Sequence, residues 1–248
     1  MAELAALLFD VDGTLAETER DGHRVAFNRA FAEHGLPWQW DEALYRELLT
    51  VAGGGERLAH YAGRFQPDWL RTPGNAERLD AIHQSKNHHF AQLLAAGEIR
   101  LRPGLTTLLD AARDAKLALG IVTTTSRANL DALLDLLPPR HAGIFSPKVC
   151  GEDVARKKPD PECYLLALRR LRMAPERVLA VEDSRNGLRA AGDAGLRTVI
   201  VRSRYFRHED FSEAAAVVDA FSQLPLPTLR RAAAAPLPGR DGSVHEAV

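Results

Sequence analysis

The chain has 248 residues, of which 46% are hydrophobic and 26% charged, and its formal net charge is −1. This composition suits a soluble globular protein with one substantial core and a small second domain, and it excludes collagen-like, disordered and membrane-spanning classes. Balanced charge gives no broad field that would attract nucleic acid or an anionic membrane, so we expect neither as a partner. An anionic substrate has to be held by a local cluster of charges.

The cysteines and the first apolar run bear on the compartment. Cys150 and Cys163 are too few for a disulfide framework or a zinc site, which favours a reducing compartment and two small core residues. No apolar run approaches the ~20 residues that a bilayer span needs. Residues 4–9 lack the basic flank and cleavage site of a signal peptide. We expect a cytoplasmic protein, and a monomer.

Short apolar runs, each of the length of a buried strand, recur along the chain. They cover residues 4–9, 117–122, 177–181, 198–201 and 215–218. Amphipathic helical patterns separate the later runs. This alternation predicts an α/β fold with a Rossmann-like, mostly parallel sheet, helices on both faces, and ligands at the carboxyl ends of the strands.

Residues 16–99 break this alternation, because they read as successive helices with breaks at Gly35 and Pro67. The break predicts an α-helical cap inserted into a core made of residues 1–15 and 100–224. A cap inserted after the first strand would lie above the strand ends, where it could close over a substrate and exclude water. Helices packed permanently on the sheet edge are the alternative.

The last segment, residues 225–248, is rich in Pro, Ala and Gly. It shows no apolar period sustained beyond one or two turns. We therefore expect a disordered tail there.

Two carboxylates, Asp10 and Asp12, follow the first predicted strand in the segment FDVDGT. In an extended segment residues i and i+2 lie on the same side, so these acids would repel unless a cation bridged them or one were protonated. A divalent metal resolves the repulsion, and the all-oxygen setting favours Mg²⁺. The alternative is that Asp12 and Gly13 only form a reverse turn.

The next two motifs contain hydroxyl groups and a lysine pair. The segment LGIVTTTSR ends a strand in Thr123, Thr124 and Thr125 before a helix start, where hydroxyls and N–H groups can bind an anion. Ordinary helix N-caps use the same residue types. In VARKKPDPE, Lys157 and Lys158 precede a proline. Lys158 is a candidate to neutralise a phosphoryl group and the attacking carboxylate, although such a pair is often only a solvated surface feature.

The segment VLAVEDSRNG repeats the design of the first motif, with a buried strand that ends in Glu182 and Asp183, followed by Ser184 and Asn186. The two acids would supply oxygen ligands to the same Mg²⁺. A helix N-cap would account for Asp183 or Ser184 but not for the whole set. The four strand ends together offer charges that balance one metal and one phosphate dianion.

In this order and spacing, DVDGT, VTTTS, KKPDP and VEDSRNG resemble the four motifs of the haloacid dehalogenase superfamily, over residues 4 to about 218. The resemblance implies a phosphatase with Asp10 as nucleophile and Asp12 as general acid and base. Asp10 would form an aspartyl phosphate while Asp12 protonates the leaving oxygen and then deprotonates a water. The resemblance also implies that Thr123 and Lys158 hold the phosphoryl group. It further implies Mg²⁺ bound by Asp10, the Asp12 carbonyl and Asp183, with Glu182 adjacent.

Further segments, mostly in the predicted cap, resemble the CbbY group of xylulose-1,5-bisphosphate phosphatases: AETE, AFNRAFAEHG, YRELLTVAGGGER, IHQSK and RHEDF. The likeness implies a sugar bisphosphate as substrate and a link to the Calvin cycle. It implies a substrate site shared by the strand ends and the underside of the cap. The expected substrate-binding residues are Asp10, Glu17, Gly53, Gly54, Glu56, Arg57, His83, Lys86, Thr123, Thr124, Thr125, Ser126, Arg127, Asn129 and Lys158.

A second phosphate needs a second cation site, for which Arg57, Lys86 and Arg127 are candidates. The group usually reads Gly-Gly-Lys-Glu-Arg, whereas this chain has Gly55 in place of the lysine, and it has an additional residue between positions 19 and 23. The missing lysine removes a cation from the distal-phosphate pocket that the resemblance implies, which weakens the bisphosphate assignment. The core chemistry is untouched.

Three other functions are alternatives to this prediction. A phosphomutase resembling the β-phosphoglucomutases would share the core, the cap type and both carboxylates, and would return the phosphoryl group to sugar. A phosphatase of another small metabolite, such as phosphoglycolate, is the second. A non-catalytic binding protein that keeps only the fold is the third, since fold alone does not secure function.

Overall fold

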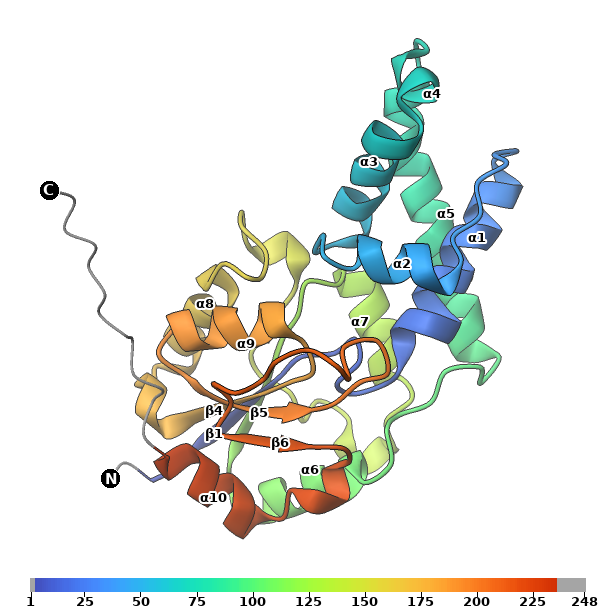
Figure 1. The fold of residues 1–248 in the computed structure, drawn as a ribbon. Coiled ribbons are helices and arrows are strands. Elements are labelled where there is room, and N and C mark those ends of the chain that lie inside the picture. The colour runs from blue at the N-terminus through green and yellow to red at the C-terminus, as the bar shows by residue number, and fades with distance from the viewer. Residues whose placement is uncertain (1–2, 236–248) are drawn as a thin grey trace, which may run out of the picture.

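A six-stranded sheet forms the centre of the computed structural model, which describes residues 3–235 (Figure 1). Its strands are β1 Ala6–Phe9, β2 Ala118–Val122, β3 Lys148–Val149, β4 Val178–Glu182, β5 Arg197–Val201 and β6 Ala216–Val218. Their order is β3-β2-β1-β4-β5-β6, and every neighbouring pair is parallel. The predicted α/β class is confirmed. Sequence patterning missed β3, because two residues carry no readable apolar run.

Helices cover both faces of this sheet (Figure 1). On one face lie α6 (Leu105–Asp114) and α10 (Leu226–Ala234), and on the other lie α8 (Glu162–Leu171) and α9 (Arg185–Asp193). Helix α7 (Arg127–Leu134) follows β2. Short 3₁₀ turns complete this part of the chain, at Pro139–His141, Gly151–Asp153, Pro175–Arg177 and Phe221–Gln223.

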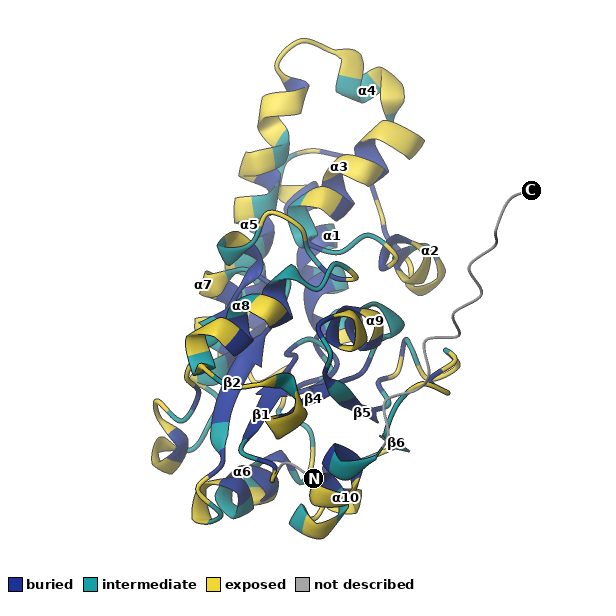
Figure 2. Cartoon of the chain, turned by 90° about the vertical axis from the view of Figure 1, so that its left-hand side faces the viewer, coloured by how far each residue is buried: buried dark blue, intermediate teal, exposed yellow. Residues whose placement is uncertain are grey.

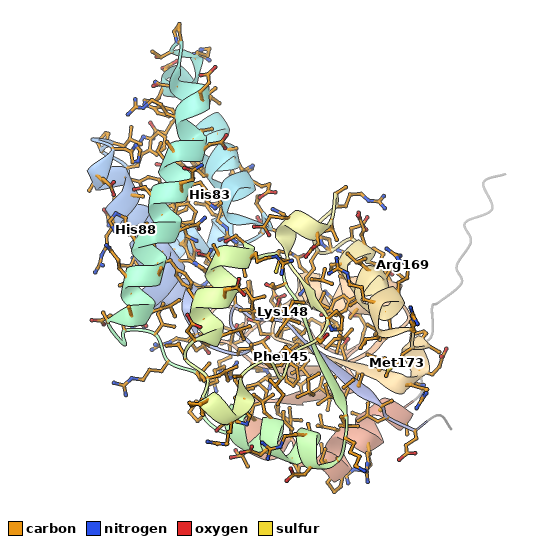
Figure 3. The ribbon with its side chains drawn as sticks, turned by 180° about the vertical axis from the view of Figure 1, so that it is seen from behind. His83, His88, Phe145, Lys148, Arg169 and Met173 are labelled. Atoms are coloured by element: carbon orange, nitrogen blue, oxygen red, sulfur yellow. The ribbon has the colours of Figure 1, made fainter. Side chains whose placement is uncertain are left out.

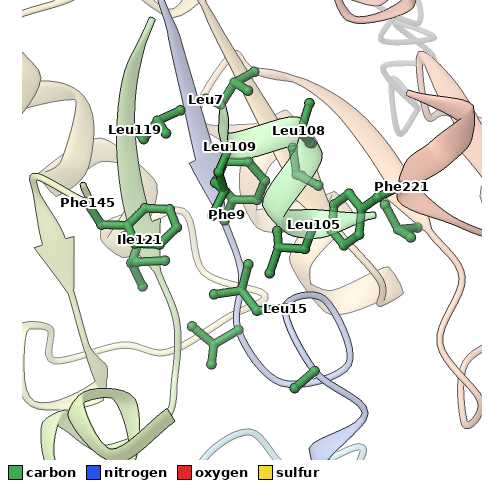
Figure 4. Close-up of a cluster of buried hydrophobic side chains, with 14 of the residues drawn as sticks. Leu7, Phe9, Leu15, Leu105, Leu108, Leu109, Leu119, Ile121, Phe145 and Phe221 are labelled. Atoms are coloured by element: carbon green, nitrogen blue, oxygen red, sulfur yellow. The ribbon is translucent and has the colours of Figure 1, made fainter. Parts of the chain in front are cut away.

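The strands β1, β2, β4 and β5 are mostly apolar because both of their faces are buried. Leu7 and Phe9 of β1 point into the cluster that α6 completes (Figure 4). Ala6 and Leu8 point the other way, toward α8 and α9. In Figure 2 the central strands are mostly buried, β6 at the sheet edge is of intermediate burial, and the outer sides of α8 and α9 are exposed. This continuous burial is why the strands were readable as uninterrupted apolar runs.

The helices between β1 and α6 stand beyond the carboxyl ends of the strands (Figure 1). They are a π-helical turn at Glu19–His23, α1 Arg24–Glu33, α2 Glu42–Leu48, α3 Gly54–Phe65, α4 Pro67–Arg71 and α5 Asn75–Ala95. They enclose an aromatic cluster that includes Phe27, Phe31, Trp38, Trp40 and Tyr61. This segment, residues 16–99, is called the cap below. None of the helices in residues 3–235 combines the length and the apolar composition that a membrane span requires.

The expected disordered tail from residue 225 is wrong for the part that the structure describes. Residues Leu226–Ala234 form α10, with Leu229 fully buried and Ala232 and Ala233 nearly so. Pro225 and Pro227 stand at the helix start, where proline is tolerated because its missing N–H has no partner to lose. The helix is too short for its apolar period to be visible in the sequence. Residues 236–248 lie outside the described residues.

Candidate active site

A cavity of about 590 Å³ lies where the carboxyl ends of the strands face the cap. Its wall contains most of the predicted site residues, from both sides: Asp10, Asp12, Gly53, Gly54, Glu56, Arg57, His83, Lys86, Thr124, Thr125, Ser126, Asn129, Lys158 and Asp183. The other four predicted residues, Glu17, Thr123, Arg127 and Glu182, lie outside the cavity wall. The fold thus gathers side chains from distant parts of the chain at one place.

Lys158 fixes the environment of Asp10, which follows β1 directly. Its ammonium donates to Asp10 Oδ1 at 2.7 Å, to Glu182 Oε1 at 2.6 Å and to the carbonyl of Val122 at 2.7 Å. Burial by itself lowers the pKa of Lys158, but the charges of Asp10 and Glu182 outweigh it and raise that pKa well above its usual range. Lys158 is therefore a permanent cation beside Asp10.

Glu182, at the end of β4, is fully buried and committed to neighbouring donors. Its Oε1 also accepts from the Tyr164 hydroxyl at 2.7 Å, and its Oε2 accepts from the N–H of Asp183 at 3.2 Å. A Cβ on Gly187 would lie 2.0 Å from the Glu182 carboxyl carbon, so a side chain at position 187 would collide with it. Glu182 therefore orients Lys158, and its oxygens are already occupied.

Asp10, Glu182 and Asp183 form a buried acidic group in which one oxygen of each lies within 4.8 Å of the others. Burial, together with the charges of neighbouring carboxylates, raises the pKa of Asp10 and of Asp183 well above the usual range. Asp183 Oδ2 is buried and has no hydrogen-bond partner among the described residues. Three clustered carboxylates, of which only Asp10 and Glu182 contact the Lys158 ammonium, fit a divalent cation that prefers oxygen ligands, and the unpartnered Asp183 Oδ2 is available to it.

Gly13 lets the first motif approach this acidic group. Its φ is +83°, and a Cβ there would lie 1.9 Å from Asp183 Oδ2. Both the backbone conformation and the space therefore require glycine. The sequence Asp-Gly after β1 is thus a close-approach feature as well as a turn.

Asp12 has a different environment from Asp10, although it lies only two residues further along. Its Oδ1 accepts from Thr18 Oγ1 at 2.6 Å and lies 2.8 Å from His23 Nε2. Burial by itself raises the pKa of Asp12, but interactions with His23, Thr18 and Lys86 outweigh it and hold that pKa well below its usual range. Asp12 is therefore a carboxylate bound by residues at the entrance to the cap.

Two residues of α5, Lys86 and Phe90, set the orientation of His23. Lys86 Nζ lies 2.9 Å from His23 Nδ1, and the ring stacks on Phe90 with centroids 4.0 Å apart. An ammonium can only donate, so Nδ1 is the acceptor and the proton on Nε2 points to Asp12. The cap thus reaches the acid of the first motif through a chain of two hydrogen bonds.

Sequence analysis missed Thr18 and His23 as site residues. They are five positions apart, a spacing that does not place two side chains on one face of an α-helix. The intervening turn, Glu19–His23, is π-helical and accommodates one residue more than an α-helical turn. This is the stretch in which the chain has its additional residue, so that length difference was the available signal.

The predicted hydroxyl cluster lies at the start of α7. Thr123 is buried, and its hydroxyl accepts from the N–H of Thr125 at 3.2 Å. Ser126 caps the helix by accepting from the N–H of Asn129 at 3.3 Å. Asn129 donates to Asn87 of the cap at 3.1 Å. The cluster therefore shapes one wall of the cavity and joins it to the cap.

The predicted cations differ in where their charges point. Arg57 is buried; it donates to Tyr45 Oη at 3.0 Å and to the carbonyl of Leu48 at 3.3 Å, and it lies 3.9 Å from Glu19. Arg127 pairs with Asp153 at 2.6 Å, outside the cavity wall. The charge of Arg57 is therefore directed to partners within the cap, and the charge of Arg127 to a partner in the core.

Contacts with neighbouring residues also fix the positions of His83 and Glu17. His83 projects from α5 (Figure 3) and lies against Gly54, where an added Cβ would be 2.6 Å from its Nε2. Burial, with the nearby charge of Lys86, lowers the pKa of His83 to about 4, so the ring is neutral at pH 7. Glu17 accepts from the N–H of Arg204 at 3.3 Å and lies outside the cavity wall.

Known proteins resemble this chain over most of its length. Residues 4–195 match the family model of the haloacid dehalogenase-like hydrolases. The CbbY protein of Cereibacter sphaeroides is 46% identical over 224 residues, which cover 89% of this chain and 94% of that protein. The CbbY protein of Rhodobacter capsulatus is 44% identical over 232 residues, which cover 90% and 100%.

A solved structure extends the likeness to three dimensions. A mutant of CbbY from Rhodobacter sphaeroides, in complex with xylulose 1,5-bisphosphate, superimposes with a TM-score of 0.83 at 46% identity. The match covers 91% of this chain and 99% of that one. The chain therefore belongs to the haloacid dehalogenase-like hydrolases, and the phosphatase that its four motifs predict is confirmed.

Proposed function

We propose that the protein is a Mg²⁺-dependent phosphatase that removes a phosphate from a sugar bisphosphate, such as xylulose 1,5-bisphosphate, through an aspartyl phosphate on Asp10. One observation carries the proposal. Asp10 and Asp12 are held by different partners, Asp10 by Lys158 within the acidic group and Asp12 by Thr18 and His23. Two neighbouring carboxylates in unlike surroundings are suited to different chemical roles.

The metal would be held by Asp10, the main-chain carbonyl of Asp12 and Asp183. The unpartnered Asp183 Oδ2 and the raised pKa values of Asp10 and Asp183 support this choice, because a bound cation would relieve both. When bound, Mg²⁺ supplies positive charge to the phosphoryl oxygens and keeps the nucleophile ionised. Glu182 stays with Lys158 and Tyr164.

In the first step a carboxylate oxygen of Asp10 attacks phosphorus in line, and the bond between phosphorus and the sugar oxygen breaks. Lys158 remains beside Asp10 and offsets the negative charge that accumulates there. Asp12, in its protonated form, gives its proton to the leaving oxygen. The hydrogen bonds from Thr18 and His23 favour the carboxylate that results, so they assist the transfer itself, while they make the protonated form that begins this step the less populated one.

In the second step the Asp12 carboxylate accepts a proton from a water molecule, and the water oxygen attacks phosphorus. The bond between phosphorus and Asp10 breaks, which releases inorganic phosphate and regenerates the nucleophile. The Nε2–H of His23 keeps Asp12 in place throughout. The low pKa of Asp12 matches this second step, in which the group starts as a base.

A sugar bisphosphate is supported by the relative with which xylulose 1,5-bisphosphate forms a complex, at 46% identity over most of both chains. The cavity also suits such a ligand, because basic side chains reach it from the core and from the cap. Its volume of about 590 Å³ is in the usual range for a small-molecule site.

The test is to incubate the purified protein with xylulose 1,5-bisphosphate and Mg²⁺ and to follow inorganic phosphate together with the sugar product. We expect one phosphate for each sugar phosphate formed, and loss of the reaction when EDTA is added. An isomeric sugar phosphate without phosphate release would refute hydrolysis in favour of a mutase. Ribulose 1,5-bisphosphate, glucose 1-phosphate and phosphoglycolate complete the panel, compared by kcat/KM. A clear preference for phosphoglycolate would refute the bisphosphate assignment.

A further inference from the structure

A bisphosphate brings a second phosphate group, and this group needs a cation whose present partner it can displace. Among the described residues, the arginine and lysine side chains in the cavity wall are Arg57, Lys86, Lys157 and Lys158. Lys158 is bound to Asp10 and Glu182, and Lys86 to His23. The cap holds Arg57 through Tyr45, Leu48 and Glu19. The fourth basic residue, Lys157, has a different kind of partner.

Lys157 comes from the core but ends against the cap. Its ammonium forms an ion pair with Glu56 Oε1 in the first turn of α3. The Glu56 side chain is 50% exposed and that of Lys157 is 22% exposed, so water competes for this pair. A Cβ on Gly53 would lie 2.7 Å from Lys157 Nζ. The ammonium thus lies beside the glycine segment 53–55.

This glycine segment carries no charge of its own at residues 53–55. The core loop that carries Lys157 fills the same neighbourhood. The neighbouring residue, Lys158, points instead to Asp10 and Glu182. Two adjacent lysines therefore supply one ammonium to the reacting end of the cavity and one to its cap wall.

We propose that Lys157 binds the phosphate that is not being cleaved, and so supplies from the core a positive charge at the cap wall of the cavity. This inference rests on the proposed function. It makes Lys157 a specificity-determining residue for bisphosphates. The exchange it requires is small, because a phosphate dianion takes the place of the single carboxylate of Glu56 in a partly exposed pair, and such pairs are weak.

The experiment compares preference, defined as kcat/KM for xylulose 1,5-bisphosphate divided by kcat/KM for glucose 1-phosphate. We expect Lys157→Met to lower this ratio at least about tenfold, the range of a lost charged hydrogen bond, mainly through KM for the bisphosphate. Lys157→Arg keeps the charge and should retain most of the preference. Arg156→Met is the matched control, since Arg156 is exposed, pairs with Asp160 and lies outside the cavity wall.

A second pair of variants separates direct binding from a mere cap contact. Glu56→Gln breaks the ion pair but leaves the ammonium, so it should not lower the preference. Gly55→Lys in the Lys157→Met background should restore it, because a Cβ on Gly55 meets only His83, at an ordinary 3.6 Å. Glucose 1-phosphate turnover shows that each variant is folded.

Three outcomes would overturn the inference: an unchanged ratio in Lys157→Met, an equal loss in Glu56→Gln, or no recovery with Gly55→Lys. The failure of the proposed function looks different. In that case the wild-type protein itself releases no phosphate from the bisphosphate. If the wild-type protein hydrolyses the bisphosphate and Lys157→Met keeps its preference, the role of Lys157 alone is refuted.

Discussion

The two ends of the cavity are built in opposite ways. At the core end, Lys158 Nζ has three acceptors within 2.7 Å, and the carboxylates of Glu182 and Asp183 are almost fully buried. At the cap end, the pair of Lys157 and Glu56 is partly exposed. Removing one partner of a buried charge network costs roughly 3–5 kcal/mol, whereas an exposed pair contributes about 0–1 kcal/mol.

This contrast has a functional consequence. The residues proposed to perform the chemistry are also needed to neutralise one another, so their identities are tightly constrained. The charged residues at the cap end can be exchanged with little loss of stability.

The largest effect is expected from replacing the proposed nucleophile, Asp10, at the core end of the cavity. Asp10→Asn keeps an oxygen that can accept from Lys158 but removes the attacking carboxylate, so kcat should fall by at least about 10³-fold. Phosphate release measures this, and calorimetry should show that the variant still binds the bisphosphate. Asp21→Asn is the control, because Asp21 pairs with Arg20 and lies outside the cavity wall. A variant that keeps a tenth of the activity would show that the nucleophile is misassigned.

A smaller effect is expected when the proposed metal ligand Asp183 is replaced. Asp183→Asn should raise the Mg²⁺ concentration for half-maximal activity at least about tenfold. Thermal unfolding gives a readout that does not depend on activity. The raised pKa of Asp183 means that the metal-free protein loses stability as pH rises above the ordinary aspartate value, because the unfolded chain ionises first.

At pH 7 without Mg²⁺, the Asp183→Asn variant should therefore melt at a higher temperature than the wild-type protein. Added Mg²⁺ should raise the melting temperature of the wild-type protein and reverse that order. Identical Mg²⁺ responses in the two proteins would remove Asp183 from the metal site. Asp193→Asn, at the end of α9 and outside the cavity wall, is the matched control.

The smallest effect is expected at the cap end of the cavity, where the protonation of Lys86 should make activity depend on pH. Burial lowers the pKa of Lys86 to about 8, against the charges of Asp12 and Glu19. Above that pH the side chain becomes neutral and no longer fixes His23 as donor to Asp12, so kcat/KM should decline from about pH 8 upward. Lys86→Arg keeps its charge, so the decline should move up by at least about one pH unit. A decline at the same pH in both proteins would exclude Lys86 as its origin.

Protein stability gives a second check on the same group. Because the folded-state pKa of Lys86 lies below the unfolded value of 10.5, the unfolded chain binds the proton more tightly. The wild-type protein should gain stability between about pH 8 and pH 10.5 from this group. Lys86→Arg should lack that gain, which denaturant titrations at several pH values would measure.

Sequence patterning predicted the strands of the sheet well where burial is continuous. The runs around β1, β2, β4, β5 and β6 were readable because each strand has helices or loops on both faces. Two elements were lost for the same physical reason, shortness. β3 has two residues, and α10 has too few turns for its period to show.

The candidate site divides in the same way. Asp10, Asp12 and Asp183 follow predicted strands closely, so their meeting at one sheet edge could be predicted from a parallel sheet alone. Lys158 follows the missed strand β3 at a distance, so the resemblance to the family motif was what predicted its role. Thr18 and His23 could not be predicted, because a π-helical turn places them and no regular period marks it.

By itself the sequence determined the parallel sheet, the four motifs at its carboxyl edge and the family, because contiguous residues after buried strands have little choice of position. Tertiary structure decided how the charges are shared. It bound Arg57 within the cap and turned Arg127 to Asp153, and it brought Lys157 to the cap segment where Gly55 stands. A long basic side chain can reach many partners, so only the packed arrangement of cap and core selects which one it meets.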